Sequence, residues 1–206
     1  MNELRYAWEP YLKYGQKKTF ENNTVIYSQG DKGNGFYYLV EGGAKITILS
    51  DQYEERIVSH IPTGALFGLH GVNNSEHYLT TAITTSPSIL YYFSNHSLSQ
   101  IYAHHPEAAP IFINSVIRII RLLSDIVHYF DSPIEKKMAF YLLILTEVYE
   151  SNTLSIDQSA FVQFMGKSRV SVNKIIQKWK QEGLIQLSNR SICIHDKNKL
   201  KEIITH

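Results

Sequence analysis

The 206-residue chain is long enough for one large domain or two small ones, and its 44% hydrophobic content is sufficient for a buried core. No run of eighteen apolar residues occurs and the N-terminus lacks the order of a signal peptide, so we expect a cytoplasmic protein without a membrane partner. The single cysteine, Cys193, excludes an internal disulfide and a cysteine-ligated iron–sulfur cluster. The net charge of +1 is unevenly divided, with −3 on residues 1–110 and +5 on residues 151–206, which favours a nucleic-acid-binding face in the C-terminal part.

Residues 19–93 have the composition of many short strands. Stretches rich in β-branched and aromatic residues alternate there with Gly, Pro, Asn and Asp. This pattern predicts an antiparallel β-roll, either a barrel or a jelly roll.

Apolar residues recur at helical spacing in the next segment. They alternate in steps of three and four and comprise Ile113, Val116, Ile120, Leu123, Val127 and Phe130. The spacing predicts a long helix with a coiled-coil seam, and therefore a homodimer. The alternative is a core helix in a monomer, which would carry a similar apolar face.

The long helix is predicted to end at a hinge. Asp131, Ser132 and Pro133 break the helical pattern, and proline is tolerated in the first turn of the helix that follows. We therefore expect a β-domain at 1–109, the long helix at 110–131 and a C-terminal domain at 132–206.

The stretch QFMGKSRVSVNKIIQKWKQEGLI, at 163–185, has the features of a helix-turn-helix. Apolar residues precede Gly166, which suits the turn, and a second apolar set follows at helical spacing, comprising Val172, Ile175, Ile176 and Trp179. Two short strand-like segments, LIQL and SICIH, come next and predict the wing of a winged helix. A helical hairpin with a purely structural role is the alternative.

The opposite face of the second helix is predicted to bind DNA. Arginine can bind guanine through two hydrogen bonds, lysine and serine suit phosphates, and Val170 can pack against a thymine methyl group. The predicted DNA-binding residues are Lys167, Ser168, Arg169, Val170, Ser171, Asn173, Lys174, Lys178, Lys180 and Arg190.

The order of these parts resembles the CRP/FNR family of regulators. The resemblance lies in Gln29-Gly30-Asp31, FYYLVEG at 36–42, Pro62-Thr63-Gly64 with Phe67-Gly68, Leu142-Leu143, and GKSRVSVNKII at 166–176. It implies an α+β chain with a β-roll like that of cyclic-nucleotide-binding domains, a dimerisation helix and a winged helix-turn-helix. It also implies an effector-controlled regulator that binds inverted-repeat double-stranded DNA and, if it is an activator, contacts RNA polymerase.

The resemblance also suggests where an effector binds and what it is not. Members that bind cyclic AMP have Gly-Glu where this chain has Gly68-Leu69, and Arg-Ser where it has residues 76–78, Glu-His-Tyr. Leucine cannot accept a hydrogen bond from a ribose hydroxyl and Glu76 would repel a phosphate, so we expect another effector, an aromatic or anionic metabolite. Residues 67–74 and Val170 resemble the chlorophenol-responsive members. The expected effector-binding residues are Leu69, His70, Asn73, Asn74, His77, Tyr78, Thr80, Arg118, Arg121 and Leu122.

Three alternatives use other chemistry. A haem- or metal-responsive regulator or a cupin-like metalloenzyme would need ligand pairs, but the nine histidines form no HxH or HxxxH pair, so we expect no metal or cofactor. A regulatory subunit or channel tail with a cyclic-nucleotide-binding domain would not end in a basic DNA-binding domain. We find no nucleophile–base pair or phosphate loop and do not expect an enzyme.

Overall fold

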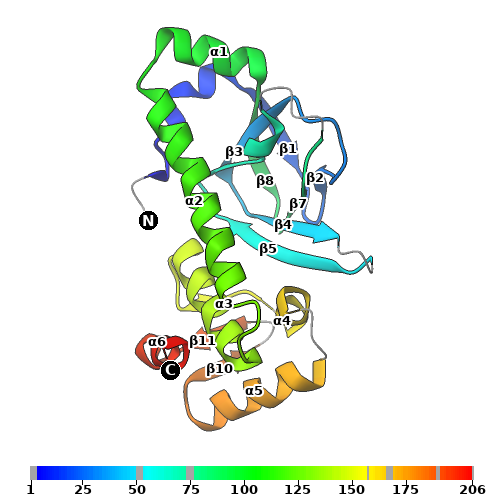
Figure 1. Ribbon diagram of the computed structural model, residues 1–206, viewed down its shortest axis with the longest axis vertical. Coiled ribbons are helices and arrows are strands. Elements are labelled where there is room, and N and C mark those ends of the chain that lie inside the picture. The colour runs from blue at the N-terminus through cyan, green and yellow to red at the C-terminus, as the bar shows by residue number, and fades with distance from the viewer. Residues whose placement is uncertain are drawn as a thin grey trace. The chain divides into compact units, whose positions relative to one another are not determined.

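The computed structural model describes residues 4–49, 53–72, 77–156, 158–165, 169–188 and 191–205. The chain forms two compact units, Met1–Leu123 and Ser124–His206 (Figure 1). The boundary between them lies within the longest helix, α2 (Ala108–His128).

The first unit is the predicted antiparallel β-roll. One sheet has the strand order β1 (Gln16–Phe20), β8 (Ser88–Ser94), β3 (Gly35–Glu41) and β6 (Leu66–Phe67). The other has the order β2 (Val25–Tyr27), β7 (Thr81–Thr84), β4 (Ala44–Leu49) and β5 (Glu55–Ile61). The strand pairs that join these elements are antiparallel.

Alternation along β3 gives the first sheet two buried faces. Leu39 packs with Leu90 and with Ala44 of the second sheet, between the sheets. Phe36 and Tyr38 belong to a separate cluster that contains Trp8, which lies just before the 3-10 helix η2 (Glu9–Tyr14). This cluster also includes residues of α1 (Asn95–His104) and α2, so these helices cover the outer face of the sheet.

The second unit contains the predicted winged helix-turn-helix. Its elements are α3 (Ile134–Val148), β9 (Thr153–Leu154), α4 (Gln158–Met165), α5 (Arg169–Gln181), β10 (Ile185–Ser188), β11 (Ser191–Ile194) and α6 (Lys197–Thr205). Strands β10 and β11 form the expected wing, β9 adds a third strand, and α6 packs on α3. Neither β9 nor α6 is predicted from the sequence.

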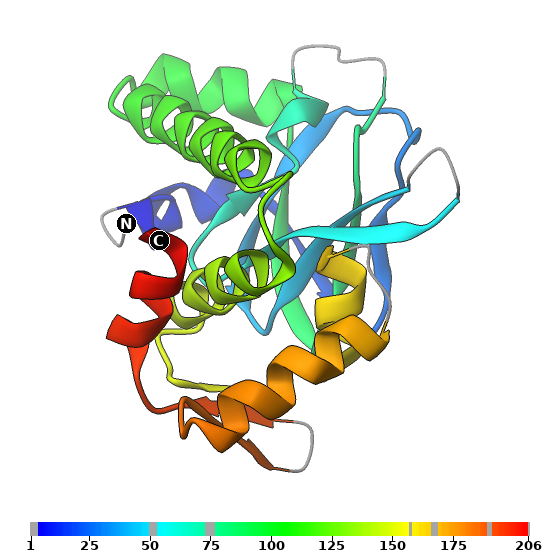
Figure 2. The same ribbon diagram turned by 60° about the horizontal axis from the view of Figure 1, so that its bottom comes forward.

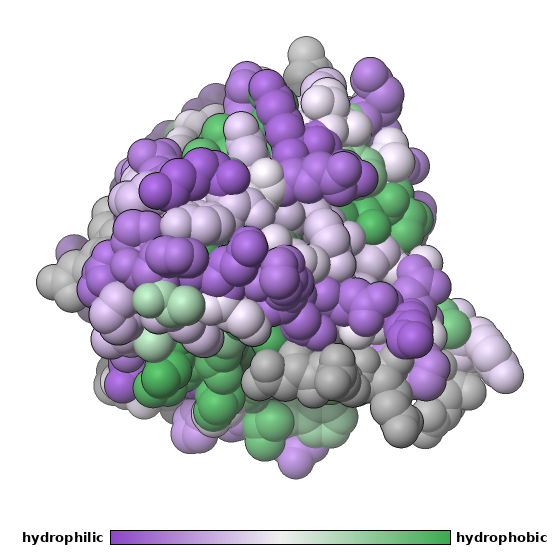
Figure 3. Space-filling model, turned by 90° about the horizontal axis from the view of Figure 1, so that it is seen from above, coloured by the Kyte–Doolittle hydropathy of each residue, from purple (hydrophilic) through white to green (hydrophobic). Residues whose placement is uncertain are grey.

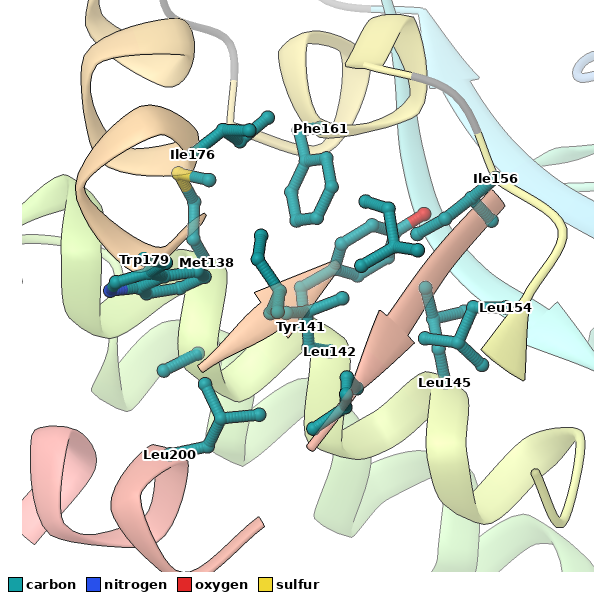
Figure 4. Packing of buried hydrophobic residues seen from close by; sticks show 14 of the residues in the cluster. Met138, Tyr141, Leu142, Leu145, Leu154, Ile156, Phe161, Ile176, Trp179 and Leu200 are labelled. Atoms are coloured by element: carbon teal, nitrogen blue, oxygen red, sulfur yellow. The ribbon is translucent and has the colours of Figure 1, made fainter. Parts of the chain in front are cut away.

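One hydrophobic core holds this unit together. Met138 and Leu142 of α3 pack in the same cluster as Phe161 of α4 and Trp179 of α5. Figure 4 shows Trp179 beside Met138, with Leu200 of α6 below them. The two helices of the predicted helix-turn-helix are therefore anchored to a common support.

His60 on β5 makes the stability of the protein depend on pH. Burial, together with the nearby charge of Lys45, lowers the pKa of His60 to about 4. The unfolded chain therefore binds this proton at higher pH than the folded chain does, so stability is lost as pH falls below about 6.5 and the loss is complete below about 4.

We expect His60→Leu to reduce the acid-induced loss of unfolding free energy by up to about 3 kcal/mol, as a pKa shift of this size implies. Urea unfolding between pH 7 and 4 measures the loss, and the exposed His128→Gln variant is the control. Identical pH profiles for wild type and His60→Leu would contradict the assignment.

Candidate nucleic-acid interface

Helix α5 has one buried face and one exposed face. Val172, Ile176 and Trp179, spaced by four and three residues, are fully buried in the core of the second unit. Because each residue of an α-helix turns by about 100°, this spacing directs the opposite side chains away from the core. In Figure 2 the helix lies in front of the other elements of its unit.

Four of the predicted DNA-binding residues are exposed in the first half of α5. Arg169, Asn173 and Lys174 are exposed, and the side chain of Val170 is 79% exposed. These side chains combine hydrogen-bond donors and acceptors with an apolar group, which is the chemistry needed to contact base edges and phosphates in a major groove.

The other predicted residues differ from this group. Ser171 is only half-buried on the side of the helix between the two faces, and Lys180 is exposed near the end of α5. Lys167, Ser168 and Arg190 lie outside the described residues, so their predicted roles stay predictions.

Gln177 is a residue of this face that we did not predict. It is exposed and follows Asn173 by four residues, which puts it on the same side of α5. Glutamine can bind adenine through two hydrogen bonds. The helical spacing that identified Arg169 and Asn173 could also have identified Gln177.

Lys178 is exposed, but its ammonium group is held by an intramolecular contact. Its Nζ donates to Glu135 Oε1 at 2.8 Å and to Oε2 at 3.0 Å. The indole Nε1 of Trp179 also donates to Glu135 Oε1, at 2.8 Å. A lysine held by a carboxylate has less positive charge available for a phosphate.

The contact between Lys178 and Glu135 shifts the pKa values of both groups. Burial raises the pKa of Glu135, but the hydrogen bonds from Lys178 and Trp179 outweigh burial and leave it below its ordinary value. The hydrogen bond to Glu135 raises the pKa of Lys178. Both groups are therefore held in their charged forms at neutral pH.

The predicted effector residues of the β-roll do not form one group. Leu69 is buried in the cluster that contains Trp8, and His77 is exposed. His70 and Tyr78 are brought together, with ring centroids 5.5 Å apart, and His70 Nε2 lies 3.1 Å from Thr80 Oγ1. Asn73 and Asn74 lie outside the described residues.

Tyrosine rings surround His70 and Tyr78, and we did not predict them. Tyr27 stacks on Tyr78 at 4.1 Å and on Tyr37 at 5.7 Å. Burial raises the pKa of Tyr37 to about 12 and lowers that of His70. These groups are therefore uncharged at neutral pH. The strand positions of Tyr27 and Tyr37 were visible in the sequence, but their meeting depends on the pairing of the sheets.

The predicted residues of α2 are divided between different environments. Arg118 is half-buried, and burial and the charge of Arg5 lower its pKa. Arg121 is exposed and Leu122 is half-buried. We expected Arg118, Arg121 or Leu122 to approach the residues around His70, and this stays a prediction.

An apolar row runs along the outer face of α2 and continues to Phe130, just after its end. Five residues of the predicted dimer seam are exposed, namely Ile113, Ile120, Leu123, Val127 and Phe130. Val116, the sixth, packs against the β-roll cluster, while Ile117 is exposed. In the space-filling view of Figure 3 most of the surface is hydrophilic, and hydrophobic residues gather in separate patches.

Metal sites and membrane-spanning helices are two further features that could indicate a function. Within the described parts of the chain, no group of three His, Cys, Asp or Glu side chains is arranged to hold a metal ion. None of the helices described has the length and apolar character needed to cross a membrane.

Comparisons with known proteins match both units. Residues 17–105 match the family model of the cyclic nucleotide-binding domain, and residues 136–203 match that of the Crp-like helix-turn-helix domain. The global nitrogen regulator of Nostoc sp. is 21% identical over 189 residues, covering 86% of this chain and 84% of that protein.

A second sequence relative and one solved structure are also similar to this chain. The CRP-like cAMP-activated global transcriptional regulator of Mycobacterium tuberculosis is 22% identical, covering 90% of this chain and 86% of that protein. The structure of FixK2 from Bradyrhizobium japonicum is similar with a TM-score of 0.79 at 13% identity, covering 92% of this chain and 96% of that one. Proteins similar in sequence to this chain are therefore transcriptional regulators and not enzymes.

The contact between Lys178 and Glu135 distinguishes two lysines of α5. We expect Lys174→Gln to reduce the slope of log affinity against log salt concentration by about 1, the change due to one lost phosphate contact. Lys178→Gln should leave the slope unchanged, because Glu135 holds that ammonium group. Titration of random-sequence duplex DNA at several salt concentrations measures both, with the exposed Lys17→Gln as control. Equal reductions by Lys174→Gln and Lys178→Gln would contradict the distinction.

Proposed function

The chain belongs to the CRP/FNR family of DNA-binding transcriptional regulators, and we propose that it acts as a homodimer that binds inverted repeats under the control of a small molecule other than cyclic AMP. The observation that carries the proposal is the exposed polar face of α5, opposite a face buried in the core. Such a helix can enter a major groove without disturbing the packing of its unit. A regulator of this kind acts on the chromosome, and we therefore place it in the cytoplasm.

The base preference follows from the exposed side chains. Arg169 is suited to guanine, and Asn173 and Gln177 are suited to adenine. Val170 has no acceptor for cytosine and can only contact a thymine methyl group. We therefore propose half-sites rich in A·T pairs, with centres roughly 34 Å apart in the inverted repeat.

The apolar row of α2 supports the homodimer. Isoleucine, leucine, valine and phenylalanine side chains are exposed along several turns of one helix face. A continuous apolar surface of this kind is typical of a protein–protein contact. A second copy of α2 would bury it, and the two-fold axis of such a dimer would match the symmetry of an inverted repeat.

The chemistry of the β-roll supports an aromatic effector. Tyr27, Tyr37 and Tyr78 offer aromatic faces and uncharged hydroxyl groups, and His70 is uncharged as well. Leu69 is packed in a hydrophobic cluster and cannot replace the acceptor that a ribose hydroxyl needs. Between the aromatic and anionic classes expected from the sequence, these residues favour the aromatic one.

An effector can switch the regulator only by binding its two states unequally. We propose that binding in the β-roll favours one arrangement of the dimer, and that the hinge at 131–133 transmits the change to α5. The direction of the switch, towards DNA binding or away from it, depends on which arrangement the effector prefers.

Selection of duplexes from a random DNA pool tests the regulator proposal. We expect an enriched inverted repeat with A·T-rich half-sites, obtained with the purified protein alone or after addition of a cell extract. Arg169→Ala should weaken binding to it by about 1–3 kcal/mol and relax the preference for one base pair. Selection that enriches no sequence under either condition would contradict DNA recognition.

A charged residue introduced into the apolar row of α2 tests the proposed dimer. Ile120 is 56% exposed, and Ile120→Lys should convert a dimer to a monomer at micromolar concentration because a lysine would be buried in the contact. Val25 on β2 is 49% exposed, and Val25→Lys is the matched control that should remain dimeric. Sedimentation velocity distinguishes the forms, and a wild-type monomer would contradict the proposal.

A further inference from the structure

Glu135 connects the start of α3 to the end of α5. It lies in the first turn of α3, two residues after Pro133 of the hinge. Its carboxylate accepts hydrogen bonds from Lys178 Nζ and from Trp179 Nε1, each at 2.8 Å to Oε1, and Lys178 Nζ also reaches Oε2 at 3.0 Å. Both partners lie near the C-terminal end of α5.

The contact with α5 is not needed for the stability of α3 itself. A glutamate in the first turn of a helix is already stabilised by the helix dipole and by water. The hydrogen bond from Trp179 is different, because this indole is fully buried in the core and has little freedom to reorient. A displacement of Glu135 therefore has to move Trp179, and with it α5.

The first turns of α3 also contact the chain that leads into the hinge. The Lys137 ammonium group donates to the Phe130 carbonyl oxygen and lies 5.5 Å from the centroid of the Phe130 ring. The rings of Tyr129 and Phe140 are 4.5 Å apart. All these residues belong to the second unit, where α3 thus contacts both the segment just after α2 and the end of α5.

We propose that Glu135 is the positioning residue through which the hinge sets the orientation of the DNA-binding helix. The proposal rests on the proposed function and adds the group that regulates its DNA-binding site. Lys178 and Trp179 together fix the Glu135 carboxylate. Lys178 Nζ donates to both of its oxygens, and Trp179 Nε1 donates to Oε1. Movement of α3 at the hinge then changes the direction in which Arg169 and Asn173 face.

The two tryptophans of the chain make the contact directly observable. Trp179 donates its indole N–H to a carboxylate, whereas Trp8 Nε1 is buried without a hydrogen-bond partner among the described residues. A ¹H–¹⁵N spectrum therefore contains one indole resonance that reports on Glu135 and one internal reference. Glu135→Gln should shift the Trp179 resonance and leave that of Trp8 in place.

DNA binding distinguishes positioning from a merely structural role. On the duplex obtained by selection, we expect Glu135→Gln to lower affinity about tenfold, a loss of roughly 1.4 kcal/mol, while binding to random-sequence duplexes changes far less. The thermal midpoint of unfolding should stay close to that of the wild type. Glu147→Gln, at an exposed position near the other end of α3, is the matched control. Unchanged affinity for the selected duplex, despite a shifted Trp179 resonance, would overturn the proposal.

A hinge-side substitution tests transmission without DNA. Lys137→Met removes the contact with the Phe130 carbonyl group and should shift the Trp179 resonance in the wild-type background, but not in Glu135→Gln. The two substitutions should therefore be non-additive. An additive result, or no response of Trp179 to Lys137→Met, would overturn the role of Glu135 even if an operator is found. Failure of the selection would reject DNA recognition instead, and the indole experiment would still decide whether Glu135 transmits the change.

Discussion

The burial of Trp179 is the constraint on which the DNA-binding unit depends. The indole fills the core beside Met138, yet its N–H needs an acceptor, because an unsatisfied buried donor costs about 1–3 kcal/mol. Glu135 supplies the acceptor, and a partly buried carboxylate in turn favours a nearby cation, which is Lys178. With Trp179 directed inward, the helical repeat turns Lys174 and Gln177 away from the core, while Arg169 is exposed at the first residue of α5.

The cost of burying polar groups also limits what the β-roll can bind, because several tyrosine hydroxyl groups are buried there. Tyrosine hydroxyl groups are stable inside a protein as long as they remain neutral, and burial raises their pKa values accordingly. The hydroxyl group of Tyr27 is buried beside the Thr80 side chain. An uncharged ring is compatible with these neutral phenols, whereas an anion would need a cation close by, and Arg118 lies near Arg5 instead.

Periodic patterns in the sequence predicted most of the fold, and contacts between distant segments account for what they missed. The strand-rich segment, the long helix and the anchors of α5 all follow from local spacing. Strand β9 has only two residues and leaves no periodic signal. Helix α6 does have a local signal that our sequence analysis missed, because the backbone N–H groups of Asn198 and Lys199 donate to Asp196 Oδ1 at its start. The role of Lys178 could not be predicted, because its partner Glu135 is 43 residues away in the sequence. The tyrosines of the β-roll likewise meet only through sheet pairing.

Helix α2 shows how a seam predicted from spacing is placed by the packing of the β-roll. Val116 packs against the β-roll cluster, whereas its neighbour Ile117 lies in the exposed row. The helix thus has two apolar faces, an inner one that belongs to the β-roll and an outer one that continues to Val127. Because the first half of α2 packs on the β-roll through its inner face, that packing determines the direction in which Ile113, Ile117 and Ile120 face.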